Sequence, residues 1–395
     1  MKHCWEYKSL GECFPYIKNG ANIKQIKNAD GLPITRIETL SGGVFNRDRM
    51  GYAGIYNLDK YSEYVLEDGD LLLSHINSKT YIGRTVEYRA KDGETIIHGM
   101  NLLRLKSNSK VINSSFFAYY TLSNDFKTNV AKIRKDAVNQ SSIAISDIRK
   151  FSIPVPPIQS QQYIVDELDK INELIRLKKE QLSDYDKLAQ SLFNEMFGDP
   201  HYNEKGWDEV IVGDVCAPKA QILRASKKFG STDEIQYIDI SSIDNLAHEM
   251  TKCTTYTMSD APSRAQQCVI KGDIVISTVR PNLKNIAIVS KDDENLVASS
   301  GFCILRPNKI DRNFLFHYIL SEYYTEYLVS LTTGANYPAV RDSDILKSKI
   351  YYPPISIQQF FAQRIELIKK QKAEIKSTIA DLETLLASRM QYWFD

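Results

Sequence analysis

Short apolar runs bounded by turn residues alternate along this chain with two long amphipathic stretches. The clearest runs, 71–74 and 274–277, each follow a Gly-Asp pair and end in serine, which is typical of a short strand after a turn. Further strands are predicted at 33–37, 100–105, 237–240 and 302–307, and aromatic-rich helical stretches at 115–133 and 313–331. The pattern predicts an α+β fold that occurs twice, in two similar α/β domains.

The second half of the chain repeats the framework of the first half. Pro156-Pro157 matches Pro353-Pro354, and Gln161-Gln162 matches Gln358-Gln359, at a constant offset of 197 residues. Solenoid repeats have periods of about 20–50 residues, so this is a duplicated module with a pseudo-two-fold relation. We predict two target domains and two spacer helices, with the order 1–157, 158–198, 199–354 and 355–395.

Each Pro-Pro pair precedes about 36 residues without glycine or proline, whose apolar positions alternate at spacings of four and three. This period of 3.5 predicts a coiled-coil seam, and two separate surface helices are the alternative. At roughly 1.5 Å per residue each helix would be about 54 Å long, and an antiparallel pair would form a rigid spacer. The predicted seam consists of Ile164, Leu168, Ile171, Ile175, Leu182, Leu192, Phe361, Ile365, Ile368, Ile375, Ile379, Leu382 and Leu386.

Composition narrows the function classes only slightly. The chain of 395 residues has 50 Lys+Arg and 49 Asp+Glu, so a DNA-binding face would have to be local. The six cysteines form no CxxC pair and no zinc-like spacing, and no metal site is expected. An apolar leader and a run long enough for a membrane span are both missing, so we expect a cytoplasmic protein without a membrane partner.

The sequence argues against catalysis. An amino-methyltransferase needs an Asn/Asp-Pro-Pro-aromatic element, whereas here Val155 and Tyr352 precede the Pro-Pro pairs. Glycine-rich cofactor loops of the GxGxxG or Walker type are also missing, and the six histidines are scattered. We therefore expect a chain without enzymatic activity and without a cofactor.

Two modules, two helices, the Pro-Pro-Ile-x-x-Gln-Gln start of each helix and the Met196-Phe197-Gly198-Asp199-Pro200 exit together resemble the specificity subunit of type I restriction-modification systems. The resemblance implies a non-catalytic chain that reads a split, asymmetric duplex DNA target, one half-site per domain, with the helices as a ruler. It also implies two docked adenine-N6 methyltransferase (M) subunits and, through them, restriction (R) subunits. A protein-interaction scaffold that binds no DNA remains the alternative, since the net charge is only +1.

Polar loops at equivalent places in the two halves are the candidate DNA contacts. Lysine suits phosphates, whereas arginine and asparagine suit base edges. The loops after Ser74 and Ser277 contribute His75, Asn77, Lys79, Tyr81, Arg84, Arg280, Asn282 and Lys284. The segments before the Pro-Pro pairs contribute Arg134, Asn139, Gln140, Asn336, Tyr337 and Arg341, and the resemblance implies that Asn139 and Asn336 lie close to DNA. Because the framework repeats and the loops differ, we expect two different half-sites.

Overall fold

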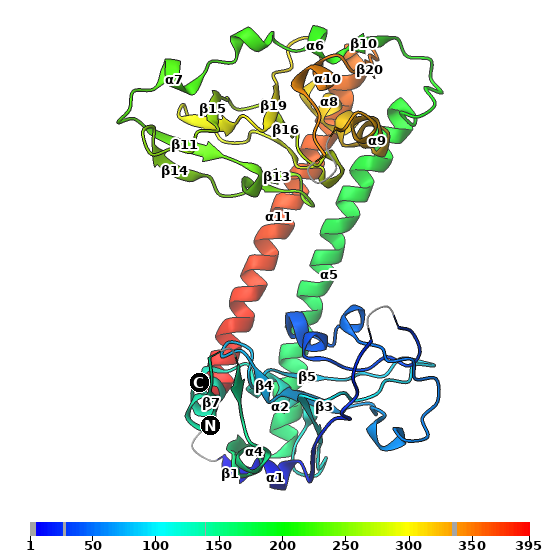
Figure 1. Ribbon diagram of the computed structural model, residues 1–395, viewed down its shortest axis with the longest axis vertical. Coiled ribbons are helices and arrows are strands. Elements are labelled where there is room, and N and C mark those ends of the chain that lie inside the picture. Colours follow the sequence, from blue (N-terminus) through cyan, green and yellow to red (C-terminus); the bar gives the residue numbers. More distant parts are fainter. Residues whose placement is uncertain (1–4, 27–28, 139, 334–337) are drawn as a thin grey trace. The chain divides into compact units, whose positions relative to one another are not determined.

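The computed structural model describes residues 5–26, 29–138, 140–333 and 338–395, and the chain forms two compact units (Figure 1). Unit 1 contains the chain up to Lys179 together with Ser377–Asp395, and unit 2 contains Glu180–Lys376. The first and last thirds of the chain therefore both contribute to unit 1. No helix among the described ranges has a stretch apolar enough to cross a membrane.

Unit 1 contains nine of the named strands and four short helices besides parts of the two long ones. The strands are β1 (Glu6–Ser9), β2 (Tyr16–Asn19), β3 (Leu71–Ser74), β4 (Ile76–Asn77), β5 (Thr85–Glu87), β6 (Leu102–Lys106), β7 (Lys135–Asp136), β8 (Ser141–Ser142) and β9 (Ser152–Val155). The helices are α1 (Leu10–Cys13), α2 (Ser114–Tyr120), α3 (Asn124–Ile133) and α4 (Ile145–Lys150), with 3₁₀ turns η2 (Ile37–Gly43), η3 (Arg47–Arg49) and η4 (Ser62–Tyr64).

The centre of unit 1 is an antiparallel sheet in the order β2-β6-β3-β5. Leu71 and Leu73 of β3 face a core that α2, α3 and the start of the first long helix complete. Leu72 faces a second cluster on the opposite side of the sheet. A strand that is buried on both faces reads as a continuous apolar run, which is the pattern that predicted β3.

Unit 2 repeats this arrangement and adds a larger second sheet. Its strands are β10 (Glu209–Ile211), β11 (Glu234–Ile238), β12 (Ile243–Asp244), β13 (Glu249–Met250), β14 (Thr254–Thr257), β15 (Ala265–Cys268), β16 (Ile274–Ser277), β17 (Ile286–Ile288), β18 (Leu296–Ser299), β19 (Phe302–Leu305) and β20 (Lys349–Tyr351). Its helices are α6 (Val212–Val215), α7 (Ala225–Lys228), α8 (Arg312–Leu320), α9 (Glu322–Ser330) and α10 (Asp342–Leu346), with turns η5 (Lys219–Gln221), η6 (Ile240–Ser242) and η7 (Pro281–Leu283).

The sheet β17-β16-β19 of unit 2 corresponds to β5-β3-β6 of unit 1. Its strand β16 again alternates between two cores, with Ile274 and Ile276 on the helix side and Val275 on the other. The second sheet, β14-β11-β18-β15, contains one parallel pair, β11 with β18. The internal repeat is thus present in the fold, which confirms the predicted class of two α+β domains with long helices.

Each Gly-Asp turn is fastened to the neighbouring strand by an equivalent ion pair. Asp70 accepts from Arg104 of β6 at 2.6 Å, and both side chains are almost fully buried. Asp273 accepts two hydrogen bonds from Arg306, which follows β19, both at 2.8 Å. Each carboxylate also accepts from a backbone N–H of its own turn, at Glu67 or Ile270. The repeated Gly-Asp motif therefore has a structural role.

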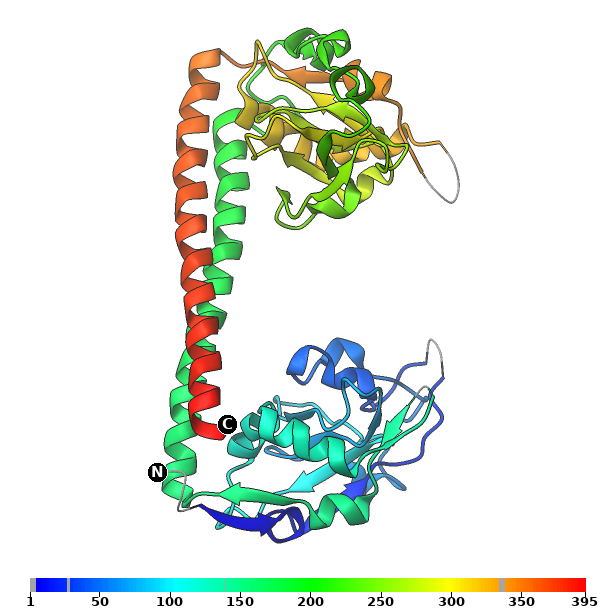
Figure 2. The ribbon, with the colours of Figure 1, turned by 90° about the vertical axis from the view of Figure 1, so that its left-hand side faces the viewer.

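The long helices α5 (Ile158–Phe197) and α11 (Ile355–Phe394) run antiparallel within each unit (Figure 2). In unit 1, Glu167 accepts two hydrogen bonds from Arg389, and in unit 2 Asp186 pairs with Lys372 at 2.5 Å. The helices pair within one chain in this structure. Eight predicted seam residues are buried, namely Ile164, Leu168, Ile171, Ile175, Phe361, Ile365, Ile375 and Ile379. The other five, Leu182, Leu192, Ile368, Leu382 and Leu386, are half-buried.

The end of each long helix contributes an aromatic anchor that the period of 3.5 does not mark. Phe197 lies 4.6 Å from the ring of Phe314 in unit 2, and Phe394 lies 5.5 Å from the ring of Phe116 in unit 1. Both rings are buried. Each helix therefore starts beside one domain and ends in the core of the unit that contains the other.

The repeated glutamine explains why the chain turns into each helix in the same way. Gln161 is fully buried, donates to the carbonyls of Pro156 and Val111, and accepts from the N–H of Asn113. Gln358 donates to the carbonyl of Pro353 and accepts from the N–H of Asp311. Each side chain thus joins the Pro-Pro segment to the first helix of its domain's helical pair.

Two local predictions need correction. The predicted strand at 33–37 is wrong, because only Ile34 makes single bridges, to Gly51 and Ile97, and a 3₁₀ turn starts at Ile37. Each aromatic-rich helical stretch is two helices, which separate where a serine caps the second one. Ser123 accepts from the N–H of Phe126, and Ser321 accepts from that of Tyr324.

Candidate nucleic-acid interface

In unit 1, the two predicted DNA-contact segments form one small sheet. After β3 the chain enters β4, which pairs antiparallel with β8, and β8 pairs antiparallel with β7. The register places Ile76 opposite Ser142 and Asn77 opposite Ser141. Segments about 65 residues apart in the sequence are therefore side by side at the end of the central strand.

Asp136 lies at the centre of the polar side chains on this sheet. Its carboxylate accepts hydrogen bonds from Ser141 Oγ at 2.6 Å and Arg134 Nε at 3.0 Å, and it pairs with Lys79 Nζ at 3.1 Å. The hydrogen bond from Ser141 and the one from Lys79 hold the pKa of Asp136 below its usual value. Lys79 remains 61% exposed, so its ammonium is accessible to a phosphate.

The residues directly after β3 are tied into the domain more tightly. Burial lowers the pKa of His75 to about 4, so its ring is neutral at pH 7. Asn77 donates to Ser74 Oγ at 3.0 Å and accepts from the N–H of Ser78 at 2.8 Å, which fixes the start of the loop. These two side chains shape the loop, and more exposed groups lie beyond them.

Tyr81 and Arg84 form a stacked pair in the same loop. The guanidinium carbon of Arg84 lies 4.5 Å from the centre of the Tyr81 ring, and Arg84 also donates to the carbonyl of Leu40. Tyr81 is 46% exposed. Gln140 is exposed, and its carbonyl closes a turn by accepting from the N–H of Ala137. Asn139 lies outside the described residues.

In unit 2, the equivalent segments meet in the same way. Val279 and Thr333 each form a bridge with Ala339, and the N–H of Arg280 donates to the carbonyl of Pro338 at 2.8 Å. The N–H of Val340 donates to the carbonyl of Thr278 at 2.9 Å. The bridge of Val279 with Ala339 corresponds to the pairing of Ile76 with Ser142 in unit 1.

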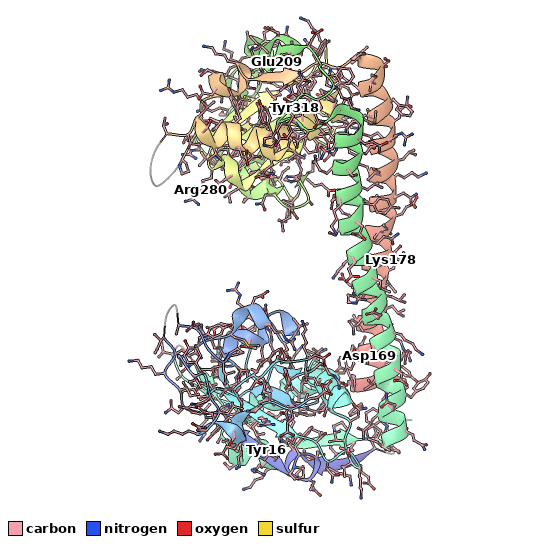
Figure 3. All side chains as sticks on the ribbon, turned by 90° about the vertical axis from the view of Figure 1, so that its right-hand side faces the viewer. Tyr16, Asp169, Lys178, Glu209, Arg280 and Tyr318 are labelled. Atoms are coloured by element: carbon pink, nitrogen blue, oxygen red, sulfur yellow. The ribbon has the colours of Figure 1, made fainter. Side chains whose placement is uncertain are left out.

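Arg280 and Lys284 flank the turn η7 and both adopt left-handed backbone conformations, with φ of 51° and 49°. Such values are uncommon for residues with side chains, and they cluster where function requires them. Arg280 is exposed and lies at the edge of its domain, on the side away from the long helices (Figure 3). Asn282, between them, is also exposed.

The remaining candidates of unit 2 have mixed surroundings. Lys284 donates to Glu322 Oε2 at 2.7 Å, so its charge is partly compensated within the domain. Arg341 is exposed, and its N–H donates to Asp344 Oδ2 at the start of α10. Asn336 and Tyr337 lie outside the described residues.

Sequence reasoning did not single out Asp136. The only sequence signal was its position within the predicted segment, at the 197-residue offset from Thr333. The side chains that would hold metal ions give no alternative explanation of this surface. Over the described ranges no group of three or more His, Cys, Asp or Glu could bind a metal, and the five cysteines described there are buried.

Comparison with known proteins agrees with this repeated architecture. The sequence profile of the type I restriction modification DNA specificity domain matches the chain twice, at residues 3–184 and 204–383. This chain belongs to the type I restriction-modification specificity subunits. The two matches include both small sheets described above.

The curated relatives of this specificity subunit are similar over nearly its whole length. The putative type I restriction enzyme MjaX specificity subunit of Methanocaldococcus jannaschii is 28% identical, and the alignment covers 97% of this chain and 92% of the relative. The MjaVIII specificity subunit of the same organism is 23% identical, with the same coverage. These names confirm the prediction of a non-catalytic specificity subunit.

Solved structures of type I systems share the fold. The S subunit of a type I restriction-modification system from M. genitalium has a TM-score of 0.54 at 15% identity, covering 99% of this chain and 96% of that chain. A chain from a structure of type I R-M complex assembly has a TM-score of 0.55 at 18% identity, covering 99% of this chain and 97% of that one. The predicted fold class is confirmed.

Proposed function

We propose that this specificity subunit recognises a bipartite, asymmetric duplex DNA target, with one half-site read by each domain. The observation that carries the proposal is the small strand pairing at the end of β3 and β16, which both domains build from equivalent segments. The framework is the same, but unit 1 exposes Lys79 and Tyr81 there whereas unit 2 exposes Arg280 and Asn282. Unlike side chains on like frames would read unlike half-sites.

The roles of single residues follow from their chemistry. Arg280 has a planar guanidinium that suits the O6 and N7 acceptors of guanine, and it lies on an exposed turn. Lys79 presents a flexible ammonium, which suits phosphate contact without base discrimination. The family membership favours DNA recognition over the alternative of a scaffold that binds no DNA.

Methylome sequencing of a host that expresses this chain with its methyltransferase tests the proposed target. A split, asymmetric methylated motif with a constant spacer is expected, because two unlike domains on a common spacer would read two unlike half-sites. A continuous or palindromic motif would contradict the proposal. The motif also provides the target duplex for the binding experiments.

Arg280→Ala and Lys79→Ala should weaken binding of the assembled complex in different ways. Arg280→Ala should cost about 1–3 kcal/mol on the target and little on a scrambled duplex, if Arg280 reads a base. Lys79→Ala should weaken both duplexes alike and reduce the slope of log K against log salt by about one. Competition binding across a salt series measures both effects.

Exposed residues elsewhere in the same domains provide matched controls. Arg264→Ala, just before β15, and Lys110→Ala, just after β6, remove the same charges from exposed positions outside the two small sheets. Neither should change target preference. Identical losses for Arg280→Ala and Lys79→Ala on both duplexes would refute the assignment of the two roles.

We also propose that two methyltransferase subunits, which transfer to adenine N6, dock on the long helices and that restriction subunits join through them. Apolar side chains that solvent reaches on α5 and α11 repeat at the 197-residue offset, which supports two like docking surfaces. They are Ile158 and Ile355, Tyr163 and Phe360, and Leu188 and Leu385, each exposed by at least 40%. Repeated exposed apolar groups are typical of a protein contact.

Tyr163→Ser and Phe360→Ser test the docking surfaces. Each variant alone should lower the number of bound methyltransferase subunits from two to one, and the double variant should bind neither, as measured by native mass spectrometry of the co-purified complex. Leu246→Ser is the matched control, because Leu246 is an exposed apolar residue between β12 and β13. Unchanged stoichiometry in the double variant would place the docking surfaces elsewhere.

A further inference from the structure

One carboxylate organises the cations on the candidate DNA surface of unit 1. Asp136 bonds to the hydroxyl of Ser141 on the neighbouring strand β8, to the guanidinium of Arg134 and to the ammonium of Lys79. Arg134 precedes β7, whereas Lys79 comes from the loop after β4. The carboxylate therefore joins two predicted DNA contacts that are far apart in the sequence.

A carboxylate at this place is unexpected if the surface only attracts DNA. Phosphates repel an acidic side chain, and the cluster of Lys79, Arg134 and Asp136 has two cations and one anion, so its net charge is +1 instead of +2. The position at the 197-residue offset in unit 2 is Thr333, which carries a hydroxyl. The carboxylate belongs to the first surface and not to the repeated framework.

We propose that Asp136 is a positioning residue that increases the discrimination of unit 1 between target and non-target DNA. The inference rests on the proposed DNA-recognition function. Asp136 holds Lys79 and Arg134 in one arrangement, which favours a half-site whose phosphates and bases match it. Its negative charge also weakens binding to DNA that offers only phosphates.

The two effects act in opposite directions on the two kinds of DNA. Without the carboxylate, Lys79 regains the rotamer freedom of a long side chain, so the target loses a preorganised contact. At the same time the surface gains one net positive charge, which strengthens the salt-dependent attraction to any duplex. A residue that only stabilised the fold would change both affinities in the same direction.

Asp136→Asn in the complete methyltransferase complex tests the inference, because asparagine has nearly the same size and lacks the charge. We expect the affinity for a scrambled duplex to rise several-fold and the affinity for the target not to rise with it. The ratio of the two affinities should fall by about fivefold or more. The slope of log K against log salt should steepen by up to about one.

Two further variants make the result specific. Asp92→Asn removes the same charge from an exposed turn of the same domain, and it should leave the affinity ratio unchanged. Asp136→Glu keeps the charge and should recover most of the discrimination. Thermal melting of each variant verifies that the domain is folded.

The outcomes separate the inference from the function on which it rests. If the wild-type complex does not prefer its methylated motif over a scrambled duplex, the proposed function fails. If the wild type discriminates but Asp136→Asn changes both affinities by the same factor, the inference is overturned. It is also overturned if Asp92→Asn lowers the ratio as much as Asp136→Asn does.

Discussion

Phe394→Ala should destabilise unit 1, although residue 394 is separated from the rest of that domain's core by more than 200 residues of sequence. Phe394 lies at the end of α11, is 7% exposed, and packs against Phe116 and Tyr120 at ring distances of 5.5 Å and 5.9 Å. The next residue, Asp395, accepts hydrogen bonds from the N–H groups of Asn124 and Asp125 at the start of α3. The final residues of the chain therefore close the core of unit 1.

The expected magnitude follows from the size of the group that is removed. Truncating a buried phenylalanine to alanine costs about 3–5 kcal/mol, because the cavity that remains is only partly filled by relaxation. A domain of this kind has a free energy of unfolding of about 5–15 kcal/mol. The substitution should therefore remove a large fraction of the stability of unit 1 and leave unit 2 nearly unchanged.

Hydrogen exchange with mass spectrometry resolves the two units, which a single melting temperature does not. Peptides of β3, β6 and α2 should lose protection in Phe394→Ala, whereas peptides of β16 and β19 should keep it. Tryptophan fluorescence gives a second measurement in a Trp207→Phe background, where Trp5 and Trp393 of unit 1 are the remaining tryptophans.

Phe197→Ala is the matched control, because Phe197 lies at the equivalent end of α5 and is 1% exposed in the core of unit 2. Its loss should lower protection in unit 2 and leave unit 1 nearly unchanged. If Phe394→Ala instead weakens β16 and β19, or costs less than about 1 kcal/mol, then the end of α11 does not complete unit 1 and the reasoning from the aromatic cluster is wrong.

Two further predictions concern buried polar groups. Gln358→Ala should lower the stability of unit 2 by about 1–3 kcal/mol in urea unfolding, because it leaves the N–H of Asp311 and the carbonyl of Pro353 without their partner, whereas Gln359→Ala at the exposed neighbouring position should change little. Burial lowers the pKa of His75 to about 4 and that of His98 to about 3, from 6.5, so protons bind more readily to the unfolded chain as pH falls below 6.5. The stability of unit 1 should therefore fall by up to about 1.4 kcal/mol per pH unit for each histidine down to about pH 4, less steeply in His98→Gln, and a stability that is independent of pH between 7 and 5 would contradict this.

The strands that sequence reasoning predicted correctly are those whose burial is decided locally. The runs 71–74 and 274–277 are apolar on both faces and follow a Gly-Asp turn, so pattern and turn chemistry agree. The run 33–37 has similar composition, but only Ile34 is bridged, and the backbone of Arg36 instead donates to Thr39 Oγ1 at the start of a 3₁₀ turn. Strand propensity was overridden there by local hydrogen bonding.

The parts that could not be predicted depend on contacts between distant segments. Strand β11 pairs in parallel with β18, about 60 residues later, and the sequence of neither strand specifies its partner. The small sheet of β4, β8 and β7 likewise arises only when the central strand places Ile76 beside Ser142. Asp136 gained its importance from this pairing, since its partners Lys79 and Ser141 become neighbours only in the folded domain.

The repeat of the sequence separates two kinds of residue by their burial. Gln161 and Gln358, Asp70 and Asp273, and Phe197 and Phe394 occur in both halves, and each side chain is buried and bonded or packed within the framework. The side chains that differ between the halves, such as Lys79 and Arg280, are exposed on the small strand pairings beyond β3 and β16. Because exposed substitutions cost little stability whereas buried polar ones cost much, the surface can change its side chains while the frame that presents them is retained. This division of stability and exposure gives a physical reason why one duplicated fold can present two different DNA-reading surfaces.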